Sequence, residues 1–64
     1  MEKTVDFMVN HIKSLRSMGR HSMVNDVIIA MQDMANGGDG GGTRQFYKGW
    51  SDNMFRIVLE RVAE

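Results

Sequence analysis

The chain has 64 residues, no cysteine and no proline, and its eight basic residues balance eight acidic ones. These numbers exclude disulfides, and neutrality argues against a function that depends on a strongly basic surface. Domains of this length bury only about 60% of the surface that they expose when unfolded, and oligomerisation is a common additional source of stability.

The first helix is predicted over about 4–18. Thr4 is a suitable N-cap, and Gly19 can end the helix in a left-handed conformation at little cost. Between them, apolar residues recur at helical spacing on one side. These residues are Val5, Met8, Val9, Ile12 and Leu15.

The second helix is predicted over about 22–35, with Ser22 as its N-cap. Its apolar positions again follow helical spacing, whereas Ile29 stands alone on the opposite, polar face. The short turn around Gly19 joins the first two helices, so they are expected to pack as an antiparallel hairpin.

A glycine-rich segment, 36–42, follows and is predicted to be a flexible linker because glycine loses the most conformational entropy on ordering. The third helix then ends near 63, but two starts are open. Thr43 could cap a long helix with a kink near Gly49, or Ser51 could cap a shorter one. We favour the long helix over 43–63, which aligns Phe46 and Trp50 along one side.

The predicted fold class is therefore all-α: a helical hairpin plus a third helix after a glycine-rich linker, in one small domain spanning 1–64. Each helix carries an apolar arc covering about half of its circumference. So much apolar surface is hard to bury within one small monomer. This mismatch predicts a dimeric helical bundle.

Neither a catalytic motif nor a set of cofactor or metal ligands is recognisable, so no enzyme activity, cofactor or metal is expected. The two histidines, His11 and His21, lack the neighbouring acidic or histidine residues that a metal site requires. No segment approaches the roughly 20 apolar residues that span a bilayer. The expected location is the cytoplasm, with no membrane association.

The leading functional hypothesis is a protein–protein interaction module that acts as a homodimer on an unknown protein partner, as an inhibitor, adaptor or assembly factor. A neutral chain with excess apolar surface and no chemical motif fits this class. The candidate partner-binding residues are Ile29, Tyr47, Lys48, Trp50 and Arg56.

The alternative is a dimeric regulator that binds nucleic acid through a basic patch around the first turn. Its candidate phosphate contacts are Lys13, Arg16, Arg20 and Arg44. Against it, Asp26 and Asp33 lie on the outer face of the second predicted helix, where they would repel DNA.

Overall fold

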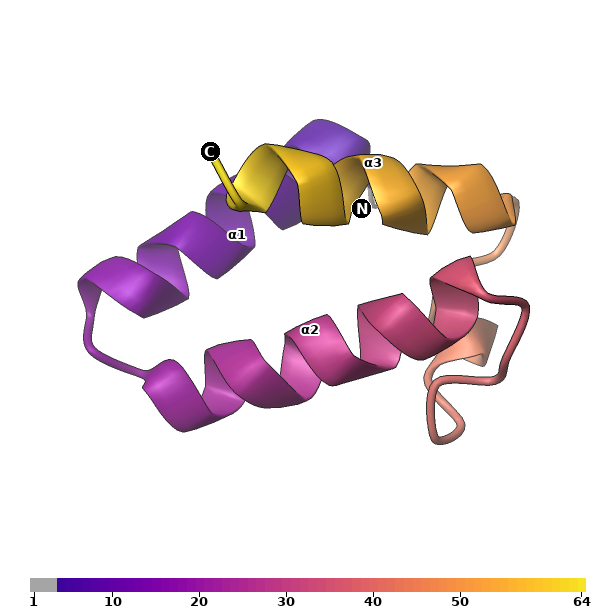
Figure 1. Ribbon diagram of the computed structural model, residues 1–64, viewed down its shortest axis with the longest axis horizontal. Coiled ribbons are helices and arrows are strands. Elements are labelled where there is room, and N and C mark those ends of the chain that lie inside the picture. Colours follow the sequence, from indigo (N-terminus) through magenta and orange to yellow (C-terminus); the bar gives the residue numbers. More distant parts are fainter. Residues whose placement is uncertain (1–3) are drawn as a thin grey trace.

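A computed structural model describes residues 4–64, in which three α-helices and a short 3-10 helix follow one another. Their bounds are α1 Val5–Ser17, α2 His21–Ala35, η1 Arg44–Phe46 and α3 Asp52–Val62. In Figure 1, α1 and α2 form the hairpin, and α3 runs back antiparallel to α2 and crosses α1. Each helix contacts the other two. The described part contains no strand, and the predicted all-α class is confirmed.

Both predicted caps of α1 are present. The Thr4 hydroxyl accepts a hydrogen bond from the backbone N–H of Phe7 at 3.1 Å. At the other end, Gly19 has a φ of 74°. The N–H groups of Gly19 and Arg20 each donate to a carbonyl of the last turn at 3.0 Å, which is the hydrogen-bond pattern of a Schellman motif.

Because this turn is tight, α2 starts one residue earlier than predicted. The helix begins at His21, with Arg20 as its N-cap, and Ser22 is already helical. The Schellman motif uses only three residues to reverse the chain, so the next helix starts at once. No side chain caps the N-terminus of α2, so the start of this helix carries no capping signal in the sequence.

The predicted long third helix is wrong, and the shorter alternative after Ser51 is correct. The chain turns at Gly49, whose φ is 84°. This turn lets the Trp50 ring pack against the Phe55 ring, with their centroids 5.0 Å apart. In a continuous helix, residues five apart point about 140° away from each other, so this contact would be lost. Aromatic packing therefore favours the break.

The glycine-rich segment does not behave as a loose linker, contrary to the prediction for 36–42. The Asp33 carboxylate accepts a hydrogen bond from the Gly40 N–H at 2.7 Å. The Thr43 hydroxyl donates to the Gly40 carbonyl at 2.7 Å. The Arg44 Nε donates to the Gly38 carbonyl at 2.8 Å. These bonds fold the segment back onto the C-terminal end of α2.

Alanine at Gly40 is expected to destabilise the protein more than alanine at Gly41. Their φ values, 65° and 66°, carry the same backbone strain, about 1–2 kcal/mol for a residue with a Cβ. A Cβ at Gly40 would lie 2.7 Å from the Thr43 hydroxyl, whereas one at Gly41 meets nothing within 4 Å. Overpacking should therefore add about 1–3 kcal/mol to the cost of Gly40→Ala. Urea unfolding of the two variants measures this difference, and equal midpoints would contradict the close packing.

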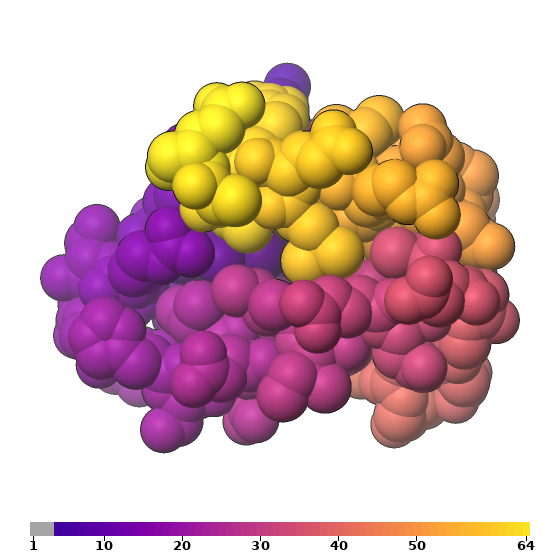
Figure 2. All heavy atoms as spheres, viewed as in Figure 1, coloured from indigo at the N-terminus to yellow at the C-terminus, as the bar shows by residue number. Residues whose placement is uncertain are grey.

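The hydrophobic core closes within a single chain. Figure 2 shows α3 packed against α2, with side chains filling the space between the helices. All three helices contribute buried residues, which are Met8, Val9, Ile12, Leu15, Val24, Met31, Met34, Ala35, Phe55, Val58 and Val62. The chain exposes 4245 Å², close to the roughly 4,200 Å² that a compact monomer of 7.3 kDa exposes.

One copy therefore buries more of its apolar arcs than was predicted, and the dimer stays a prediction. Five large hydrophobic residues stay exposed in the described part of the chain: Phe7, Met18, Met23, Ile29 and Phe46.

Candidate side-chain pocket

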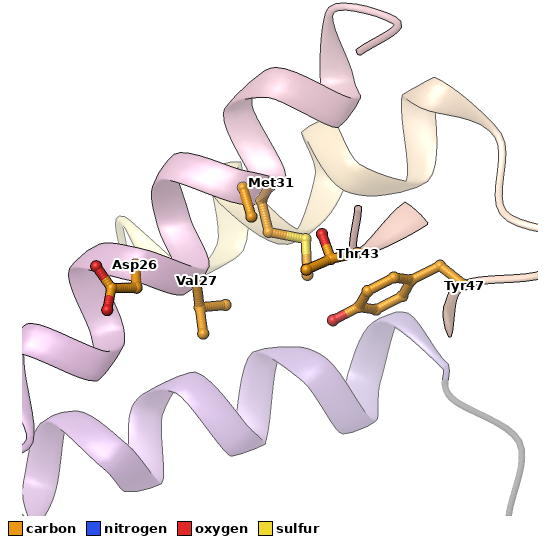
Figure 3. A pocket seen from close by; sticks show the side chains of 6 residues that line it. Asp26, Val27, Met31, Thr43 and Tyr47 are labelled. Carbon is orange, nitrogen blue, oxygen red and sulfur yellow. The ribbon is translucent and has the colours of Figure 1, made fainter. Parts of the chain in front are cut away.

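An apolar pocket of about 190 Å³ lies on one flank of α2, between this helix and the segment around η1. Figure 3 shows Val27 and Met31 on α2, with Thr43 and Tyr47 from that segment beside them. The residues that line the pocket are Asp26, Val27, Ala30, Met31, Thr43 and Tyr47.

One wall of the pocket is a single flank of α2. Asp26, Val27, Ala30 and Met31 follow the spacing i, i+1, i+4, i+5, which places them on the same side of a helix. Asp26 is exposed and lies at the end of the pocket opposite Tyr47. The two ion pairs found among residues 4–64 involve other carboxylates. A carboxylate with no cationic partner in the described chain thus stands at the mouth of an apolar pocket.

The other end of the pocket is the half-buried ring of Tyr47. It packs edge-on against the rings of Trp50 and Phe55, with centroids 5.1 and 5.4 Å away. Its hydroxyl lies 3.9 Å from the Met8 sulfur on α1. The ring is therefore held by α1 and α3 together, and it forms a fixed end wall.

Burial raises the pKa of Tyr47 above its ordinary value of 10.0. The folded state therefore holds the phenolic proton more tightly than the unfolded state does. This contribution to stability is complete below pH 10 and is lost as the pH rises through the folded-state value. We expect Tyr47→Phe to flatten the fall in unfolding free energy between about pH 9 and 11. Urea unfolding across this range tests it, and identical slopes for both proteins would count against the burial.

The predicted partner-binding residues do not form one surface. Ile29 is 63% exposed on the outer face of α2, and Lys48 is exposed near the third helix. Tyr47 and Trp50 pack against the core instead. Arg56 donates to the carbonyl of the last residue of α2 at 3.2 Å. Ile29, Lys48 and Arg56 are therefore exposed, whereas Tyr47 and Trp50 are partly buried.

The predicted phosphate contacts are also divided. Arg16 donates to the carbonyl of the last residue of α3 at 3.0 Å. Arg44 donates to the Met34 carbonyl at the C-terminal end of α2 at 2.7 Å and to the Gly38 carbonyl in the glycine-rich segment at 2.8 Å. Cations are favourable at helix C-termini because the unpaired carbonyls there carry partial negative charge. Two of the four cations, Arg16 and Arg44, therefore donate to backbone oxygens, whereas Lys13 and Arg20 are exposed.

Sequence reasoning missed both the pocket and the exposed flank beside it. Met18 and Met23, on either side of the hairpin turn, are 62% and 47% exposed. The Arg20 guanidinium lies over Met23, with its Nη1 3.8 Å from the sulfur. The sequence places Asp26 and Ala30 on the same side of α2. It does not show where the segment that carries Thr43 and Tyr47 lies, because helical periodicity gives no information about a loop.

Within the described residues, no three histidine or acidic side chains come close enough to hold a metal ion. No helix among them has the length and hydropathy needed to cross a bilayer. Comparisons of the chain with protein-family models, with curated proteins and with solved structures give no match.

Proposed function

We propose that the protein is a small non-enzymatic interaction module of the inhibitor, adaptor or assembly-factor type, which binds another polypeptide through the pocket on the flank of α2. The observation that supports it is the size and chemistry of this pocket. Pockets for cofactors and small-molecule ligands span about 300–1,000 Å³. A volume of about 190 Å³ suits a single side chain. The proposed location is the cytoplasm, because a chain without cysteine fits a reducing compartment.

The chemistry of the lining specifies the side chain that fits. Val27, Ala30 and Met31 offer an apolar wall, and Asp26 offers a carboxylate at the mouth. Lysine and arginine bury an aliphatic stem while they keep a charged head in water. A cationic head that reaches Asp26 makes a charge-assisted hydrogen bond. The preferred ligand is thus a basic side chain presented by another chain.

Ala30→Lys tests this function by filling the pocket from within. Asp26 and position 30 lie four residues apart on α2, in the order that favours an acid–base pair on a helix. The new stem should occupy the pocket, and its ammonium group should pair with Asp26, without loss of helix stability. Gln32→Lys adds the same charge on the exposed face of α2 and serves as the matched control.

The measurement is quantitative affinity capture from the source cells with the tagged chain and both variants. We expect a protein that wild type and Gln32→Lys retain equally and that Ala30→Lys loses by about tenfold or more, the cost of one displaced charge-assisted contact. Equal retention by all three proteins would contradict the use of this pocket. Retention of nucleic acid with a steep salt dependence would instead support the basic-patch alternative.

A further inference from the structure

We infer that a second copy of this chain fills the pocket, and that the side chain that enters it is Arg20. This inference rests on the proposed function, because it names the polypeptide that the pocket binds. The molecule would then be a symmetric dimer in which each copy supplies one arginine and one pocket.

Arg20 is singled out by what the other arginines do. Arg16, Arg44 and Arg56 donate to backbone carbonyls within the chain. Arg61 donates to the Asp6 carboxylate. Arg20 is exposed, and its one side-chain contact in the described chain is the weak acceptor sulfur of Met23. Of the five arginines, it is the one whose guanidinium meets no oxygen within residues 4–64.

Arg20, the N-cap of α2, and its proposed acceptor Asp26 are placed symmetrically about Met23. Arg20 precedes Met23 by three residues, and Asp26 follows it by three. Residues three apart are neighbours on a helix surface and are separated by about 4.5 Å along its axis. The three side chains therefore form one row in which a cation and an anion flank an exposed methionine.

A two-fold axis through Met23 makes this row complementary to itself. When two copies of α2 cross at a steep angle about that axis, so that the two inclined rows lie antiparallel along each other, Arg20 lies opposite Asp26 of the partner subunit, and the reverse contact forms at the same time. The two exposed Met23 side chains meet at the axis, and Met18 lies beside them at the hairpin turn. Methionine adapts to such a contact because its side chain is unbranched and polarizable.

The experiment reverses each charge separately and then mixes the variants. Arg20→Asp and Asp26→Arg each place like charges opposite each other in a homodimer, so each variant alone should dimerise at least about tenfold more weakly than wild type. In a 1:1 mixture, both contacts pair opposite charges again. Sedimentation equilibrium gives the dissociation constants, and native mass spectrometry identifies the heterodimer because the two variants differ in mass.

The mixture should recover dimerisation to near the wild-type level. Wild type that stays monomeric at millimolar concentration, charge reversals without effect, or a mixture that does not recover would each overturn the inference. Lys13→Asp and Glu60→Arg control for net charge, because both positions are exposed and lie outside this row. Each control variant alone should dimerise like wild type. Circular dichroism checks that every variant keeps its helices.

The outcome is distinguishable from failure of the proposed function. A monomeric chain that still retains a foreign protein, and loses it on Ala30→Lys, overturns the second copy as the occupant and leaves the pocket as a binding site. A dimer that dissociates on charge reversal supports the inference whether or not a further protein is captured.

Discussion

Replacing Phe55 with alanine is expected to lower the free energy of unfolding by about 3–5 kcal/mol, the usual cost of removing a fully buried aromatic side chain. Phe55 is 0% exposed. Its ring contacts those of Tyr47 and Trp50, with centroids 5.4 and 5.0 Å away. The Arg44 guanidinium lies over the Phe55 ring, 5.3 Å from its centroid.

A loss of this size is decisive in so small a chain. Natural domains are stable by only about 5–15 kcal/mol. Domains of about 60 residues also bury a smaller fraction of their surface on folding than larger domains do. We expect Phe55→Ala to be largely unfolded at 37 °C, as measured by circular dichroism and by a red shift of Trp50 fluorescence. Phe46→Ala is the control, because Phe46 is 62% exposed and its removal should cost less than about 1 kcal/mol. Equal melting temperatures for the two variants would show that Phe55 is not at the centre of the core.

Replacing Arg44 with methionine is expected to cost about 2–3 kcal/mol, because hydrogen bonds from a charged donor contribute more than neutral ones. Its guanidinium donates to the carbonyls of Met34 and Gly38 at 2.7 and 2.8 Å. It also pairs with Asp52 at 3.0 Å. One side chain therefore ties the C-terminal end of α2 to both the glycine-rich segment and the start of α3.

Two further variants separate the geometry of Arg44 from its charge. Arg44→Lys keeps the charge but lacks the planar fork that reaches several acceptors at once, so we expect it to recover less than half of the loss. Arg20→Met removes an arginine that contacts no oxygen in the described chain, and it should change stability by less than about 0.5 kcal/mol. Urea denaturation of the three variants provides the comparison. Full recovery by lysine would mean that charge alone accounts for the role of Arg44.

Local signals in the sequence were sufficient for α1 and for the body of α2. Three signals define α1: the Thr4 cap, the Gly19 turn and the spacing of the apolar residues. Each signal involves residues no more than about five positions apart, and the structure confirms all three. The exposure of Ile29 was also predictable, because a helical period assigns it to the polar face. The start of the third helix was not, since Thr43 and Ser51 carry equivalent capping signals.

The candidate site depended on contacts that no local pattern reports. Arg16 and its acceptor on α3 are 46 residues apart in sequence. Arg44 and its acceptor Met34 are ten residues apart, across a segment that composition alone marks as flexible. The sequence does not distinguish an arginine that donates to a backbone carbonyl from one whose guanidinium contacts no oxygen. The division of the basic residues, and with it the distinction of Arg20, therefore appears only in three dimensions.

The amino-acid sequence by itself determined that this chain forms helices, where two of them lie, and which side of each is apolar, because these properties follow from backbone propensity and a period of 3.6 residues. The tertiary structure alone decided that the third helix is short, that the glycine-rich segment is anchored, and that a pocket forms between α2 and the segment around η1. Each of these outcomes is a competition between a local preference and a distant contact. The aromatic contacts of Phe55 favour the short third helix, and the hydrogen bonds of the Arg44 guanidinium anchor the glycine-rich segment. Both sets of contacts join residues that only the folded chain brings together.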